Sequence, residues 1–155
     1  MSRGKFITLE GGEGTGKSTQ IGLLSAAFNN AGIDVVKTRE PGGAPGAEAI
    51  RRLLVEGDTE KWDAFTEVLL NYAARHEHLQ QTITPALELG RWVISDRFAD
   101  STVAYQGHGH GFDLSVIERV HDLVVGSMKP DLTLVLDIPV EQGLSRATSR
   151  NDQED

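Results

Sequence analysis

The sequence predicts an α/β fold in which helices cover both faces of a parallel β-sheet. Short runs rich in β-branched and aromatic residues alternate with longer runs of helical period along the 155 residues. The first of these short runs leads directly into a glycine-rich loop that opens a helix. In such folds the crossovers are right-handed and the ligand site lies at the carboxyl ends of the strands.

The strands are expected to alternate with helical segments. The expected strands are 5–10, 33–38, 92–96 and 132–137. The expected helices are 17–31, 47–55, 64–80, 84–89 and 116–125, with Asp63 as an N-cap and Gly32 and Gly90 as stop signals. The carboxyl edge of the sheet then carries five charged side chains: Glu10, Arg39, Glu40, Asp96 and Arg97.

The helix at 64–80 should present an apolar stripe to the core. Its period places Phe65, Leu69 and Tyr72 on that stripe and sets Arg75 on the flank, where its side chain can enter a cleft. Residues 146–155 are polar and end without a closing strand or docking helix. We therefore expect one domain over 1–155 that is cut short from about residue 146.

Charge and cysteine content exclude several kinds of partner and site. The net charge is −8 and the sequence pI is near 5.1, so neither nucleic acid nor an acidic membrane surface is expected to bind. The chain has no cysteine, which excludes disulfides and thiolate metal sites and fits a reducing compartment. With no signal peptide or membrane-spanning run in view, we expect a cytoplasmic protein.

The glycine-rich loop is a phosphate-binding motif, the P-loop. Residues Gly11, Gly12, Glu13, Gly14, Thr15, Gly16, Lys17 and Ser18 fit G-x-x-x-x-G-K-[ST], and the helix follows at Thr19. Backbone N–H groups and the helix dipole would hold the phosphates of ATP, and Lys17 would reach the β- and γ-phosphates. The Ser18 hydroxyl would bind Mg²⁺, with Asp96 opposite orienting the ion, and Arg97 would neutralise a phosphate.

Four arginines from separate segments, Arg39, Arg51, Arg75 and Arg97, are expected to converge near this loop.

A metal site and a GTPase function are both disfavoured by the sequence. His108 and His110 alternate with glycines and lack a third ligand nearby, so a flexible loop is expected there in preference to a metal site. No Asn-Lys-x-Asp string is present, which disfavours a GTPase.

Five motifs in order along the chain resemble thymidylate kinases. They are residues 9–20 (LEGGEGTGKSTQ), 38–43 (TREPGG), 72–75 (YAAR), 96–98 (DRF) and 101–107 (STVAYQG). The resemblance implies the fold of nucleoside monophosphate kinases, Mg²⁺-dependent transfer of the ATP γ-phosphoryl group to dTMP giving dTDP, and a homodimer.

The resemblance also implies roles for single residues. Arg75 and Arg97 would hold the phosphate of dTMP, Glu13 would approach its 3′-OH, and the remaining positions would line the pocket or contact the base and sugar: Glu40, Pro41, Arg51, Tyr72, Thr102, Tyr105 and Gln106. Because Gly14 stands where one form of the family has arginine, the catalytic cations would come from a C-terminal lid, through Arg146 and Arg150.

Two positions depart from the family pattern. Asn71 stands where an aromatic residue usually stacks on the base, and Tyr72 is the alternative for stacking; His110 replaces a frequent arginine and receives no role. The remaining alternatives are a kinase of nucleosides or of another monophosphate, and a P-loop regulatory module that binds ATP without a small acceptor.

Overall fold

Four parallel strands form one sheet in the order β2-β3-β1-β4. They are β1 (Phe6–Glu10), β2 (Val35–Arg39), β3 (Trp92–Asp96) and β4 (Leu132–Val135). The computed structural model describes residues 2–58 and 60–151, without the side chains of 150 and 151. In register, Asp96 lies opposite both Leu9 and Arg39, so the polar ends of β1, β2 and β3 meet at one edge as the sequence predicts.

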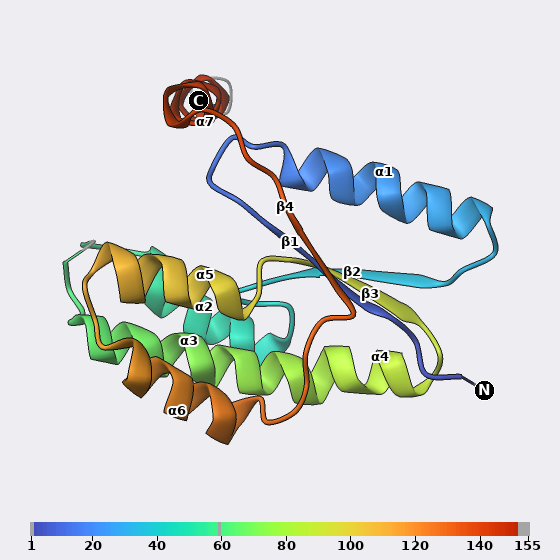
Figure 1. Ribbon diagram of the computed structural model, residues 1–155, viewed down its shortest axis with the longest axis horizontal. Coiled ribbons are helices and arrows are strands. Elements are labelled where there is room, and N and C mark those ends of the chain that lie inside the picture. The colour runs from blue at the N-terminus through green and yellow to red at the C-terminus, as the bar shows by residue number, and fades with distance from the viewer. Residues whose placement is uncertain (1, 59, 152–155) are drawn as a thin grey trace.

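Helices cover the two faces unequally (Figure 1). Helix α1 (Lys17–Asn30) lies on one face, and the opposite face carries α2 (Pro45–Val55), α3 (Ala64–His78), α4 (Thr84–Glu88) and α6 (Leu114–Val124). A π-helical segment, η1 (Leu79–Ile83), joins α3 to α4. Pro85, at the start of α4, has no N–H to continue the α-helical ladder, which accounts for a change of helical period beside it.

Alternate residues of the strands feed two hydrophobic layers. Phe6 and Val93 pack with α3, α4 and α6, whereas Ile7 and Ile94 pack with Ile21 of α1. This period-two division between faces is what a sheet buried on both sides requires. At the start of α3 the Asp63 side chain accepts a hydrogen bond from the Thr66 N–H at 2.7 Å, so the predicted N-cap is confirmed.

Three segments differ from expectation. Residues 99–109 are helical, as α5 (Ala99–Thr102) and the π-helical η2 (Val103–Gly109), where a flexible loop was expected around the two histidines. Residues 140–151 form α7 (Val140–Asn151), so the polar end segment is helical within the described residues. On α3 the expected stripe is partly wrong, because Phe65 and Leu69 are 43% and 46% exposed.

None of the helices in the described ranges has the length and apolar character needed to cross a membrane.

Candidate functional site

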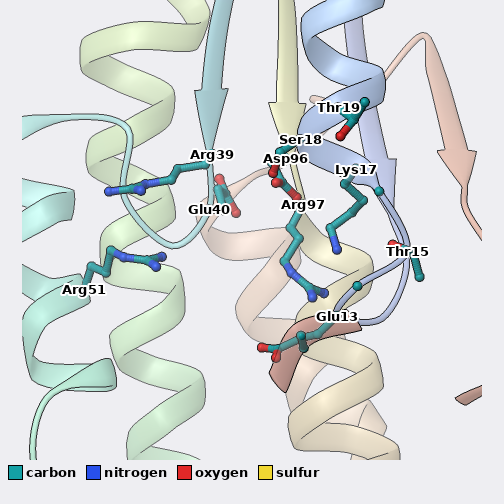
Figure 2. Close-up of a pocket in the computed structure, with 13 residues that line it drawn as sticks. Glu13, Thr15, Lys17, Ser18, Thr19, Arg39, Glu40, Arg51, Asp96 and Arg97 are labelled. Atoms are coloured by element: carbon teal, nitrogen blue, oxygen red, sulfur yellow. The ribbon is translucent and has the colours of Figure 1, made fainter. Parts of the chain in front are cut away.

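The glycine-rich loop closes one side of a cavity of about 340 Å³, which we call the loop cavity (Figure 2). Residues 13–19 line it together with Ala147 of α7 and charged side chains from the strand ends and α2: Arg39, Glu40, Arg51, Asp96 and Arg97. Helix α1 begins at Lys17, directly after Gly16 in the left-handed conformation (φ 92°). The free N–H groups of its first turn therefore open onto the cavity, and that arrangement favours an anion.

Lys17 lies at the floor of the loop cavity and is 8% exposed. Its ammonium donates hydrogen bonds to the carbonyls of Gly11 and Gly12, both at 2.9 Å. Burial lowers the pKa of Lys17 below its ordinary value, and the positive charge of Arg97 adds to this. A polyanion in the cavity would offset both effects, so the site is electrostatically prepared for phosphate.

Asp96 and Arg97 follow each other at the end of β3 and enter the cavity together (Figure 2). Arg97 has φ 71°, and no other non-glycine residue in the described chain has a positive φ. The left-handed turn brings both side chains of a dipeptide to the same side, whereas an extended strand would point them apart. Strain of this kind persists where the surroundings fix it, often at functional sites.

Oxygen Oδ1 of Asp96 is buried and has no hydrogen-bond partner within the described residues. Ser18 lines the same cavity. A buried carboxylate oxygen without a donor, in a cavity that a hydroxyl also lines, suits a hard divalent cation such as Mg²⁺. Mg²⁺ therefore fits the residues that are present.

A second cavity of about 300 Å³, the side cavity, lies between the sheet edge, α2, α3 and the helical segment α5–η2. Its lining combines charged and apolar groups, among them Pro41, Leu54, Val55, Asn71, Arg75, Phe98, Thr102, Tyr105 and Gln106. The apolar part suits a flat organic group and the guanidinium suits an anion.

Arg75 is the central cation of the side cavity and is 2% exposed. Its Nε donates to Glu40 Oε2 at 2.7 Å, and its Nη2 donates to the Phe98 carbonyl and to Thr102 Oγ1, both at 3.1 Å. His78 contacts the other Glu40 oxygen at 3.0 Å. Nitrogen Nη1 is buried and finds no acceptor in the part of the chain that is described, so one N–H pair remains for a ligand.

Glu10, at the end of β1, connects the sheet to the start of α5 through hydrogen bonds. It accepts hydrogen bonds from the Phe98 N–H at 2.8 Å and from Ser101 Oγ at 2.7 Å, and Ser101 in turn accepts from Arg97 Nη1 at 3.0 Å. Burial raises the pKa of Glu10 above its ordinary value, and the hydrogen bonds that Glu10 accepts from Ser101 and Phe98 partly counter this rise. Glu10 thereby fixes the guanidinium of Arg97 through Ser101.

Four residues line both cavities: Glu13, Glu40, Arg51 and Arg97. The two cavities therefore adjoin, and Arg51 and Arg97 lie on their common boundary, as the expected convergence of arginines requires. Arg51 also donates to the Pro41 carbonyl at 2.8 Å, which fixes its direction. Two phosphate groups, one in each cavity, would meet between these guanidinium groups, an arrangement suited to phosphoryl transfer.

Two expected site residues line neither cavity, and a third cannot be placed. Tyr72 is 1% exposed and lines neither cavity; the Arg75 guanidinium lies over its ring at 4.6 Å, so the expectation that it stacks on a base is corrected. Arg146 is exposed on α7, whose Ala147 faces the loop cavity. The side chain of Arg150 lies outside the described residues.

Helix α7 meets the loop through two glycines. A Cβ on Gly14 would lie 2.1 Å from the Gly143 carbonyl oxygen, and a Cβ on Gly143 would lie 2.7 Å from the Glu13 carbonyl oxygen. Both distances are shorter than contact allows, so only glycine permits this approach at either position. Helix α7 therefore lies against the phosphate loop at Gly143, a contact that the polarity of residues 146–155 did not reveal.

Glu67 is a side-cavity residue that the sequence analysis missed. Its spacing gave a usable signal, because Glu67, Asn71 and Arg75 follow at intervals of four and share one face of α3. The metal reading of His108 and His110 gains no support, since the described residues contain no group of three or more potential ligands.

The family model for thymidylate kinase matches residues 9–155. The thymidylate kinase of Ruegeria pomeroyi is 55% identical over 152 residues, which cover 98% of this chain and 72% of that protein. The thymidylate kinase of Caulobacter vibrioides is 54% identical over 150 residues, covering 97% and 72%. The crystal structure of thymidylate kinase from Ehrlichia chaffeensis superposes with a TM-score of 0.81 at 40% identity, covering 97% of this chain and 86% of that one.

Proposed function

The chain belongs to the thymidylate kinase family, and from this premise we propose that it transfers the γ-phosphoryl group of ATP to dTMP, giving dTDP. The observation that carries the assignment to this site is the shared boundary of the two cavities, formed by Glu13, Glu40, Arg51 and Arg97. A donor phosphate in the loop cavity and an acceptor phosphate in the side cavity would approach each other there.

On the donor side, ATP occupies the loop cavity with its phosphates on the N–H groups of residues 13–19. Lys17 leaves the carbonyls of its own loop and binds the β- and γ-phosphates. Since charge moves onto the bridging oxygen as the γ-phosphoryl group departs, a positioned ammonium stabilises the transition state more than the ground state.

Ser18 and Asp96 would hold Mg²⁺, since both line the loop cavity and Asp96 Oδ1 has no hydrogen-bond partner within the described residues. When bound, Mg²⁺ would supply the positive charge that neutralises the phosphates. Removing divalent cations with EDTA should abolish turnover and leave dTMP binding in place, because the side cavity contains neither residue.

On the acceptor side, the phosphate of dTMP binds Arg97 and the unpaired Nη1 of Arg75, with Arg51 beside them. A phosphate monoester has its second pKa near 6, so it is mostly dianionic at neutral pH and attacks without a general base. Catalysis is then alignment and charge neutralisation. The thymine lies toward Thr102, Tyr105 and Gln106, and the sugar toward Glu13 and the Glu40-Pro41 turn.

Arg146 and Arg150 complete the proposal as lid cations that close over the donor phosphates. Its remaining parts are a homodimer and a cytoplasmic location. Exposed Leu69 on α3 and Leu123 on α6 supply apolar surface that a second copy would cover. Sedimentation of the chain between micromolar and nanomolar concentrations measures the oligomeric state directly.

ADP formation measured across nucleoside monophosphates with ATP and Mg²⁺ tests the function. We expect turnover on dTMP to exceed that on dAMP, dGMP and dCMP. Rapid turnover of another monophosphate with none on dTMP would refute the proposal. A chain that binds ATP but phosphorylates no acceptor, and whose melting temperature dTMP does not raise, would indicate a regulatory module instead.

A further inference from the structure

Two amide side chains, Asn71 and Gln106, line the side cavity beside Glu67. The Asn71 Nδ2 donates to the Glu67 backbone carbonyl at 2.8 Å, one helical turn earlier. The Gln106 Nε2 donates to the Glu67 carboxylate Oε2 at 3.0 Å. Each amide therefore has its NH₂ group engaged by the same residue of α3, one through the backbone and one through the side chain.

The Glu67 carboxylate determines which way the Gln106 amide faces. An ionised carboxylate only accepts hydrogen bonds, so the amide must turn its NH₂ group toward it and its carbonyl oxygen away. A glutamine without such a neighbour can present either end, because its two ends have nearly the same shape. Asn71 is oriented by the same logic, since a backbone carbonyl is also only an acceptor.

We propose that Glu67 is a positioning residue that sets base specificity by holding the carbonyl oxygen of Gln106 toward the base. This inference rests on the proposed function. Thymine carries a donor at N3, whereas cytosine carries a lone pair there. A fixed carbonyl oxygen accepts the N3–H of thymine and repels the N3 lone pair of cytosine, so the cavity favours dTMP over dCMP.

The surroundings of Glu67 fit this role. Its side chain is 15% exposed, so its charge is partly shielded from water, and the residue lies on a regular helix that fixes its position. His110 Nε2 lies 3.7 Å from the same Oε2, beyond hydrogen-bond distance, whereas Gln106 Nε2 is within it.

The decisive variant is Glu67→Gln, which keeps the shape and removes the acceptor-only character. A glutamine at 67 can donate or accept, so Gln106 is released to face either way. We expect the ratio of kcat/KM for dTMP over dCMP to fall about tenfold or more, partly because dCMP improves. Glu118→Gln, on the exposed surface of α6, is the matched control and should leave the ratio unchanged.

The double variant E67Q/Q106E reverses the polarity of the hydrogen bond. Glutamine at 67 then donates to the carboxylate at 106, whose second oxygen faces the base, so preference for dTMP should return toward that of the unmodified chain. An unchanged ratio in Glu67→Gln, an equal loss on both substrates, or a double variant without recovered preference would each overturn the inference.

Dissociation constants for dTMP and dCMP, measured by calorimetry on the same variants, separate this inference from the proposed function. A chain that binds dTMP selectively, loses selectivity in Glu67→Gln and yet transfers no phosphate would refute the function alone. Turnover on dTMP with selectivity indifferent to Glu67 would refute the inference alone. If Glu67→Gln fails to fold, the double variant, which retains a hydrogen bond between positions 67 and 106, decides the matter.

Discussion

Replacing Glu40 with glutamine removes the negative charge that balances Arg75 without changing the shape of the side chain. Arg75 and Glu40 are 2% and 4% exposed and their Nε and Oε2 atoms lie 2.7 Å apart, so water cannot take over the lost interaction. A guanidinium cannot give up its proton to relieve the imbalance. Breaking a buried pair from one side costs about 3–5 kcal/mol. Because glutamine retains an acceptor, we expect about 3 kcal/mol of lost stability.

For a domain of this size that loss corresponds to a fall in melting temperature of about 6–12 °C. Urea unfolding followed by circular dichroism measures the change in the free energy of unfolding, and a thermal melt measures the change in melting temperature. Calorimetry should show weaker dTMP binding, because Arg75 loses its fixed direction. The matched control is Asp34→Asn, which breaks the Arg91 pair at 2.7 Å, whose side chains are 41% and 66% exposed. That pair is worth about 0–1 kcal/mol. If both variants lose equally little, the reasoning from burial is wrong.

Three further predictions concern the loop, α7 and the half-buried His121. Lys17→Ala should lower kcat about a hundredfold or more while leaving dTMP affinity nearly unchanged, since Lys17 is assigned to the donor phosphates; parallel losses would contradict that assignment. Gly143→Ala would place a methyl group 2.7 Å from the Glu13 carbonyl oxygen, so α7 should move from the loop and kcat should fall with dTMP affinity unchanged. Its control, Gly22→Ala on α1, has nothing within 4 Å of the added carbon and should gain about 0.5–1 kcal/mol; similar behaviour of the two would disprove the contact. Burial lowers the pKa of His121, so as pH falls below about 6.5 the unfolded chain takes up the proton first and stability declines. Melting temperatures between pH 7.5 and 5 should therefore fall more steeply in the unmodified chain than in His121→Gln, and equal slopes would refute the assignment.

Local signals were sufficient to predict the parallel sheet and its polar edge. Strands β1, β2 and β3 are short runs that each end in a charged residue, and their register then brings Asp96 beside Leu9 and Arg39. The glycine-rich loop specifies its own conformation, so its cavity was also predictable. These features depend on residues close in sequence.

The segments that were missed depend on distant contacts. Gly107 reads as a loop residue, yet it is buried in η2, and a Cβ there would lie 2.4 Å from Leu114 Cδ2, so the glycine permits close packing of two helices. The position of Tyr72 in the helical repeat is that of a core residue, whereas its aromatic ring is also suited to stacking on a base. Its burial, its absence from both cavities and the position of Arg75 over its ring decide between the two. Periodicity gives the face of a helix, but not which neighbour covers it.

The left-handed turn at Arg97 bears on which sequences can serve this site. Glycine and asparagine accept its φ of 71° readily but bring no charge, and lysine brings charge without the planar fork that grips a phosphate from two nitrogens. Arginine brings the planar fork but, because it carries a Cβ, it takes this φ only with strain. At position 97 the backbone geometry therefore favours glycine or asparagine whereas the proposed phosphate contact favours arginine, and the chain carries the residue that the contact requires.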